Sequence, residues 1–138
     1  ERVVVMERTN ARSLQKLPEP IDFLTMDVSF ISLTKILPKS TGWFSNQGGE
    51  GILLIKPQFE ATREESSRGV GVIRDPAIHK RVLVEVLETA VAEGYQLKGL
   101  MRSPLLGPDG NTEFLAWLEY PTGQESDNQI HTYITSLF

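Results

Sequence analysis

Three observations in the sequence predict an α/β fold with a mostly parallel sheet and an antiparallel last strand. Apolar runs of strand length alternate with segments that carry helix signals. The run at 52–56 is apolar up to its final lysine, as expected for a parallel strand covered on both faces. The runs at 95–102 and 113–120 are joined by ten residues without a helix signal, too few for a parallel crossover.

Five segments have the composition of strands. Apolar and β-branched residues dominate them, and prolines, glycines or charged residues bound them. These segments are residues 2–6, 21–26, 52–56, 95–102 and 113–120. We expect 2–6, 21–26, 52–56 and 95–101 to be parallel, with 113–120 antiparallel among them.

A helix is predicted after the second strand, over about 29–37. Ser29 or Ser32 can act as its N-cap, and apolar residues recur at helical spacing up to Leu37. Pro38 should stop or bend it, because proline lacks the N–H that a helix interior needs.

A second helix is predicted over 76–93. Asp75 is a favourable N-cap, Pro76 occupies the first helical position and Gly94 marks the C-terminal end. One apolar row runs along this segment, which should bury that face against the sheet. A shorter helix is predicted within the tail 121–138, from the spacing of its apolar residues.

The segment 59–74 is predicted to be a mobile loop. It is polar, carries Arg63 and Arg68 and contains two glycines, so it has little to bury.

Composition excludes several classes of protein. The chain has 138 residues, a formal charge of −4 and no cysteine, so disulfide and thiolate chemistry are excluded. No run of 18 apolar residues could span a membrane, and no signal peptide is visible. His79 and His131 lack the neighbours of a metal site, so we expect no metal. The strand-like opening at residue 2 suggests a part of a longer protein.

Three charged residues stand at the ends of predicted strands. Asp27 and Lys56 each follow an apolar run, and Glu113 begins the final strand. Parallel strands end, and an antiparallel strand begins, at the same edge of a sheet, where ligands bind in α/β folds. The three side chains should therefore meet there. Simpler interpretations remain open: a helix N-cap for Asp27, a solvated strand end for Lys56 and an exposed turn residue for Glu113.

Four motifs carry a family resemblance. They are "TMDVSFISL", "LLIKPQFEA", "GVIRDPAIHKRV" and "RSPLLGPDGNTEFLAWL", and together they resemble the TlyA family of ribosomal RNA 2′-O-methyltransferases. These proteins are often called hemolysin A and are related to the FtsJ-like methyltransferases. The resemblance runs from "RVVVMERTNAR" to about Tyr120. It implies a Rossmann-like sheet and S-adenosyl-L-methionine as the cofactor.

The resemblance also implies roles for the charged residues. The family transfers a methyl group with a lysine–aspartate–lysine–glutamate tetrad, of which Asp27, Lys56 and Glu113 match the last three members. The first lysine, the glycine-rich cofactor loop and an S4-like RNA-binding domain are expected before residue 1. Residues 1–138 would then be the C-terminal portion of an FtsJ-like methyltransferase domain. Candidate cofactor contacts, besides Asp27, are Glu7, Thr9 and Asn10.

The implied partner is ribosomal RNA or a ribosomal subunit, in the cytoplasm, with a cytidine of 16S or 23S RNA as the target. Candidate RNA contacts are Arg63, Arg68, Arg102 and Ser103. Lys56 is either the base or a charged group that orients the substrate, and the oligomeric state is open. Alternative functions are a non-catalytic RNA-binding module with the same fold and a hemolysin-like protein.

Overall fold

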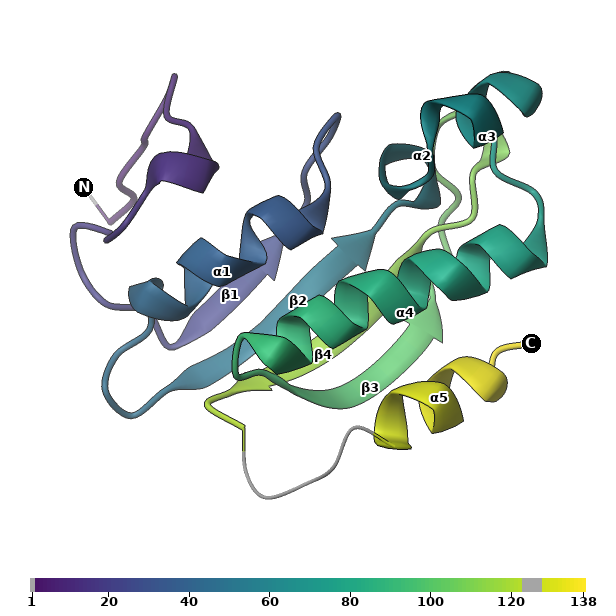
Figure 1. The fold of residues 1–138 in the computed structure, drawn as a ribbon. Helices are drawn as coiled ribbons and strands as arrows, with labels where there is room; N and C mark the ends of the chain where they lie inside the picture. The colour runs from purple at the N-terminus through teal and green to yellow at the C-terminus, as the bar shows by residue number, and fades with distance from the viewer. Residues whose placement is uncertain (1, 123–127) are drawn as a thin grey trace.

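The computed structural model describes residues 2–122 and 128–138, and its centre is a mixed sheet of four strands (Figure 1). The strands are β1 (Phe23–Met26), β2 (Gly49–Ile55), β3 (Gln96–Arg102) and β4 (Phe114–Tyr120). Their order across the sheet is β1-β2-β4-β3. β1 and β2 are parallel, and β4 is antiparallel to both β2 and β3. The predicted antiparallel direction of 113–120 is confirmed, and β3 runs in the same direction as β1 and β2.

The helices lie mainly on one side of this sheet. They are α1 (Leu37–Ser40), α2 (Pro57–Glu60), α3 (Arg63–Arg68), α4 (Pro76–Ala92) and α5 (Asn128–Thr135). In Figure 1, α4 and α1 lie over one face, α5 lies beside β3, and α2 and α3 lie beyond the end of β2. Short 3-10 helices are η1 (Ala11–Ser13), η2 (Leu33–Lys35), η3 (Thr41–Trp43) and η4 (Pro108–Gly110).

Helix α4 forms as the sequence predicts. Asp75 accepts a hydrogen bond from the backbone N–H of Ala77 at 2.8 Å, and Pro76 occupies the first turn. Gly94 has a φ of 104°, a left-handed conformation that glycine adopts without strain. The apolar row faces the sheet; its fully buried members are Val82, Leu83, Val86, Leu87 and Ala90. The predicted C-terminal helix is also confirmed as α5, although residues 123–127 of the predicted tail lie outside the described residues.

The predicted strand at 2–6 is wrong. These residues form no ladder with any described strand, and Val3, Val4 and Val5 are 77%, 62% and 71% exposed. A run of valines favours an extended backbone, but a strand also needs a neighbour to accept its hydrogen bonds. The position beside β1 stays open in the described part of the chain, because β1 pairs only with β2 there.

Two further expectations are corrected. Residues 29–37 do not form one helix: Ser32 caps η2, and α1 begins only at Leu37. Pro38 lies in the first turn of α1, where its missing N–H costs nothing, so it starts a helix that it was expected to stop. The segment 59–74 is not an irregular loop, because it contains the end of α2 and all of α3.

The core lies between the sheet and helix α4. Leu53 and Ile55 of β2 and Phe114 of β4 are at most 1% exposed, next to the buried face of α4. These positions fix the end of β2 and the start of β4. Lys56 directly follows β2 and Glu113 directly precedes β4, so both lie next to this buried region. Within the described residues, no helix has the length and apolar content that crossing a membrane requires.

Candidate active site

The strand register brings two of the predicted charges together. The last pair between the antiparallel strands β2 and β4 is Ile55 with Phe114. Lys56 and Glu113 are the next residues outward, so they occupy facing positions directly beyond the ladder. Asp27 follows the last residue of β1, which pairs in parallel with β2. The three residues therefore gather at one edge of the sheet because of how the strands are paired.

Lys56 and Asp27 form an ion pair. Lys56 Nζ lies 2.5 Å from Asp27 Oδ1, and the two side chains are 13% and 65% exposed. The lysine stem is thus buried while its ammonium meets a carboxylate that is open to solvent. Asp27 is not a helix cap, since the side chain of Ser32 caps η2. The predicted convergence of these two residues is confirmed.

Glu113 is buried beside this pair rather than exposed in a turn. It is 6% exposed, and its Oε1 accepts a hydrogen bond from Gln58 Nε2 at 2.9 Å. Gly107 passes so close that a Cβ at that position would lie 2.1 Å from Oε1, so a larger residue there would force the Glu113 carboxylate to move. None of the hydrogen bonds and ion pairs of the described residues joins Glu113 to Lys56 or Asp27. The hydrogen-bond donor to Glu113, Gln58, lies two residues after Lys56 in the chain.

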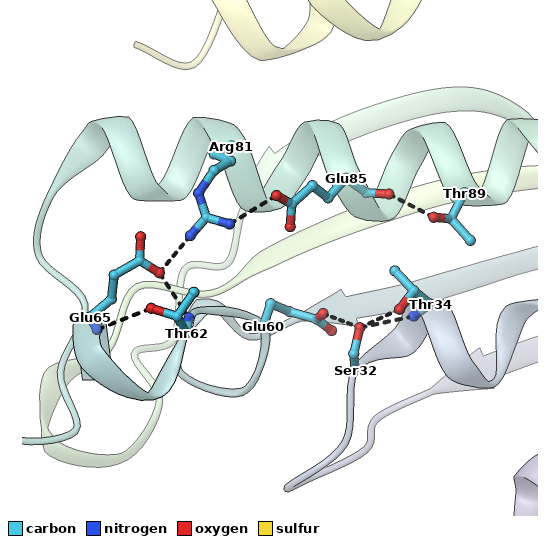
Figure 2. A network of polar contacts seen from close by, with 8 residues as sticks. All are labelled: Ser32, Thr34, Glu60, Thr62, Glu65, Arg81, Glu85 and Thr89. Carbon is cyan, nitrogen blue, oxygen red and sulfur yellow. Dashed lines mark hydrogen bonds and ion pairs between the residues drawn. The ribbon is translucent and has the colours of Figure 1, made fainter. Parts of the chain in front are cut away.

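The turn α2 also fastens the Asp27 segment. Glu60 accepts a hydrogen bond from the Ser32 hydroxyl at 2.5 Å (Figure 2). It accepts a second one from the Leu33 N–H at 2.8 Å. Burial raises the pKa of Glu60 above its ordinary value of 4.5, although both hydrogen bonds act in the opposite direction. The loop that carries Asp27 is therefore tied to the turn that follows Lys56.

Two aromatic rings stand at the opening of the site. Phe30 is 91% exposed and has a φ of 61°, an unfavourable conformation for a residue with a side chain. Its ring lies 4.8 Å from that of Phe59, which in turn lies 5.8 Å from Lys56 Nζ. An exposed phenylalanine on a strained backbone often marks a functional position.

A hollow of about 560 Å³ opens beside these rings. We call it the aromatic hollow; it is lined by Phe30, Gln58, Phe59, Ala61, Thr62, Arg63, Ser66 and Ser67. Its walls come from the Asp27 loop, from α2 and from α3, and thus it combines apolar rings with hydroxyl groups and one cation.

The two arginines of α3 differ in what they contact. Arg68 pairs with Glu64 one turn earlier, and both side chains are 73% exposed. Arg63 is exposed at the rim of the aromatic hollow and has no ion pair among the described residues. Only Arg63 therefore combines a free charge with a place at the hollow.

The other predicted RNA contacts lie on the far side of Glu113. Arg102 donates a hydrogen bond to the backbone carbonyl of Leu137 at 3.1 Å, and its guanidinium lies 5.0 Å from the Phe138 ring. Arg102 is thus engaged by the C-terminal segment. Ser103 donates its backbone N–H to the carbonyl of Glu113 at 2.8 Å, so it neighbours the site through the main chain.

The predicted cofactor contacts in the N-terminal segment make local hydrogen bonds. The Thr9 hydroxyl donates to the Glu7 carbonyl at 3.1 Å, and the Asn10 side chain caps η1. All three residues are exposed, and no hydrogen bond or ion pair of the described residues joins them to Asp27. Their role stays a prediction. The described residues also contain no group of three or more metal-binding side chains.

Sequence reasoning missed Phe30, Gln58, Phe59 and Glu60. Three of them belong to the single turn α2, directly after Lys56. The signal that could have found them is local: Pro57 follows the strand, and proline at the first helical position predicts a helical turn there. Such a turn sends successive side chains in different directions, which is how α2 reaches both Glu113 and the segment that follows Asp27.

The chain is similar to known proteins in both sequence and fold. A model of the FtsJ-like methyltransferase family matches residues 1–120, and the chain belongs to that family. The resemblance to TlyA and hemolysin A sequences is confirmed by the relatives.

Two curated relatives illustrate the similarity. The chain is 48% identical over 132 residues to the "Putative rRNA methyltransferase YqxC" of Bacillus subtilis, covering 91% of this chain and 45% of that protein. It is 40% identical over 123 residues to the 16S/23S rRNA (cytidine-2′-O)-methyltransferase TlyA of Mycobacterium tuberculosis, covering 88% of this chain and 45% of that protein. The chain therefore spans about half the length of these relatives.

A solved structure shows the same fold. The crystal structure of "a putative hemolysin from Lactococcus lactis" has a TM-score of 0.82 and 40% sequence identity. The comparison covers 99% of this chain and 66% of that one. The mixed four-stranded sheet is thus a methyltransferase-like fold, of which this chain is a part.

Proposed function

We propose that this chain is the catalytic portion of an S-adenosylmethionine-dependent methyltransferase that methylates a ribose 2′-hydroxyl of ribosomal RNA. The observation that carries the proposal is the Lys56–Asp27 ion pair, at the carboxyl edge of the parallel strands in a chain of the FtsJ-like family. The relative from M. tuberculosis is named for cytidine 2′-O-methylation of 16S and 23S RNA, which supports cytidine as the target here.

Lys56 acts in this proposal as a charged group that orients the substrate. Lys56 Nζ lies 2.5 Å from Asp27 Oδ1, and this ion pair fixes the position of the amino group at the edge of the sheet. A lysine placed in this way can donate a hydrogen bond to the 2′-oxygen and hold it in line for the displacement. Of the two roles that the sequence leaves open, the geometry favours this one.

Glu113 is the group that we assign to the hydroxyl proton. The cofactor supplies a methyl group on a positively charged sulfur, which makes that carbon electrophilic. As the new carbon–oxygen bond forms, the hydroxyl becomes strongly acidic, so a carboxylate is basic enough to accept its proton. Glu113 lies opposite Lys56 beyond the β2–β4 ladder, on the side of the site away from Asp27.

The cofactor assignment rests on Asp27. Its carboxylate is 65% exposed, and only its Oδ1 is engaged by Lys56, so its other oxygen fits the cationic end of S-adenosylmethionine. Glu7, Thr9 and Asn10 are retained as candidates for the adenosine end. Their side chains would have to exchange local hydrogen bonds for contacts with the cofactor.

We assign the RNA substrate to the aromatic hollow. Enzymes that modify nucleotides in RNA commonly stack an unpaired base on an aromatic ring and neutralise its phosphates with arginine. Phe30 supplies an exposed ring within a segment that begins at Asp27, and Arg63 supplies an unpaired cation at the rim. Arg68, Arg102 and Ser103 are weaker candidates, because the two arginines already have partners.

The complete protein is proposed to contain the rest of the methyltransferase domain, with an S4-like RNA-binding domain. The length of the relatives supports this, and so does the sheet face that carries Ile52, Leu54, Leu115 and Trp117. Ile52 pairs with Trp117 and Leu54 with Leu115. These side chains are only partly buried, and Trp117 remains 40% exposed. An apolar row of this kind is a suitable surface for further helices.

The test is to map ribose methylation. Ribosomal RNA from cells with and without the complete protein should differ by the loss of at least one 2′-O-methyl group, detected by mass spectrometry. Restoring the wild-type gene should restore the modification, whereas a Lys56→Ala gene should not. Identical methylation maps in the two strains would refute the proposal. Full restoration by Lys56→Ala would remove Lys56 from the mechanism.

A further inference from the structure

Gln58 joins the two parts of the candidate site. It is the second residue of α2, and its Nε2 donates a hydrogen bond to Glu113 Oε1 at 2.9 Å. Glu113 lies in the segment before β4, 55 residues away in the chain. One side chain therefore connects the strand end that carries Lys56 with the strand start that follows Glu113.

The carbonyl end of the same amide is an exception in this structure. Of the buried side-chain nitrogen and oxygen atoms in the described residues, only Gln58 Oε1 lacks a hydrogen-bond partner. Turning the amide over would place Oε1 against the Glu113 carboxylate, so the contact with Glu113 fixes the orientation.

Glu113 is confined from two directions. The backbone of Gly107 closes one side, since a Cβ there would lie 2.1 Å from Oε1, and the Gln58 amide holds the same oxygen from another. Gln58 itself has little freedom, because α2 is closed by hydrogen bonds from the Phe59 N–H to the Lys56 carbonyl and from the Ala61 N–H to the Pro57 carbonyl. Oε1 of the carboxylate is thus contacted from two directions.

We propose that Gln58 is a positioning residue for methyl transfer: its amide keeps the Glu113 carboxylate in the orientation that accepts the hydroxyl proton. The inference rests on the proposed function, from which it takes the role of Glu113. It accounts for an amide at this position, because an apolar side chain could not donate a hydrogen bond to the buried carboxylate. It also predicts that Gln58 acts only through Glu113.

The first test uses Gln58→Met in the complete protein, with methyl transfer to ribosomal RNA as the assay. Methionine has a similar length and no hydrogen-bonding amide. We expect kcat to fall at least about tenfold, the rate equivalent of one hydrogen bond to a charged group, with little change in KM. Thermal unfolding should shift to a lower temperature, because the buried Glu113 carboxylate loses a donor, so rates are compared well below the unfolding transition of both proteins. Gln15→Met, at an exposed position, is the matched control and should change neither.

A double-mutant cycle separates positioning from a merely structural role. In a Glu113→Gln background, Gln58→Met should cause no further loss of rate, because the group through which it acts has already been altered. Losses that multiply in the double variant would overturn the inference. An unchanged kcat in Gln58→Met, measured in an assay in which the wild type is active, would also overturn the inference. An inactive wild type would instead contradict the proposed function.

Gln58→Glu supplies a second readout if the methionine variant folds poorly. It keeps the size of glutamine, but at neutral pH it places a carboxylate without a donor against Glu113. We expect low activity at neutral pH and partial recovery as the pH falls, because a protonated carboxyl can donate the missing hydrogen bond. A pH profile of the same shape as that of the wild type would overturn the positioning role.

Discussion

Turn α2 and helix α3 are separated by two residues, and each carries a glutamate that accepts a backbone N–H. Figure 2 shows both glutamates, Glu60 and Glu65. Glu60 of α2 reaches inward and accepts hydrogen bonds from Leu33 and Ser32. Glu65 of α3 accepts the N–H of Thr62 at 2.8 Å and pairs with Arg81 at 2.6 Å. The two carboxylates have similar local chemistry but different surroundings.

Their pKa values shift in opposite directions. Burial raises the pKa of Glu60, and its hydrogen bonds do not offset this. The hydrogen bond from Thr62 lowers the pKa of Glu65, with Arg81 acting in the same direction. Turn α2 therefore holds the active-site loops together but buries a carboxylate to do so. Helix α3 is a surface helix that begins with a capping box.

The largest expected effect is on Lys56, at the start of the inward turn. Lys56→Ala in the complete protein should lower the rate of methyl transfer about 10²–10⁴-fold, as for loss of a positioned charged group. Lys56→Arg should keep part of the rate, because a guanidinium stays protonated and can still donate. Single-turnover kinetics with ribosomal RNA would measure both. Glu64→Ala in α3 is the control and should leave the rate unchanged.

An inactive Lys56→Arg variant with normal cofactor and RNA binding would contradict the orienting role and restore the base as the better assignment. Full activity in Lys56→Ala would remove Lys56 from the mechanism altogether.

The second effect is on the inward carboxylate. Glu60→Ala leaves the Leu33 N–H and the Ser32 hydroxyl without their acceptor in a partly buried place, and should lower the free energy of unfolding by about 2 kcal/mol. Glu60→Gln keeps an acceptor and should lose less. Urea denaturation compares the two variants with the wild type. A loss under about 0.5 kcal/mol for Glu60→Ala, the range of ordinary surface substitutions, would show that the link is dispensable.

The contributions of Glu60 and Glu65 to stability should depend on pH in opposite ways. The pKa of Glu60 is raised above 4.5, so the stability that this group contributes is full below pH 4.5 and is lost as the pH rises through the raised value. The pKa of Glu65 is lowered, so its contribution is present above pH 4.5 and is lost as the pH falls through the lowered value. Glu60→Gln should therefore become relatively more stable than the wild type as the pH rises, and Glu65→Gln relatively less.

Unfolding free energies measured at several pH values from acid to neutral would check these slopes. Two variants with slopes of the same sign would contradict the view that burial dominates at Glu60 and partners dominate at Glu65.

The sequence was sufficient where local signals and packing agree. Helix α4 has its cap, its proline and its apolar row in the sequence, and the antiparallel β4 follows from the length of the preceding connection. The pairing of Asp27 with Lys56 was also predictable, because both follow strands that end at one edge of the sheet.

The sequence was insufficient where the outcome depends on a neighbour. Residues 2–6 have strand composition, but only a pairing partner makes a strand. Pro38 can end one helix or begin another, and the choice depends on how the preceding residues pack. Helix α3 was missed although "TREE" carries the pattern of a capping box, with Thr62 at the cap and Glu65 three residues later. The contacts of Gln58 and Phe30 are tertiary, and no local pattern encodes them.

The smallest expected effects concern the two arginines of α3. Arg68 pairs with Glu64 in solvent, so Arg68→Ala should change the free energy of unfolding by less than about 0.5 kcal/mol and should leave the salt dependence of RNA binding unchanged. Arg63 is free at the rim of the aromatic hollow. If it meets one phosphate, Arg63→Ala should reduce the slope of log affinity against log salt by about 0.7–1. Binding titrations at several salt concentrations measure both slopes. Equal slopes for the wild type and Arg63→Ala would exclude a phosphate contact at Arg63, and the substrate assignment would then rest on Phe30 alone.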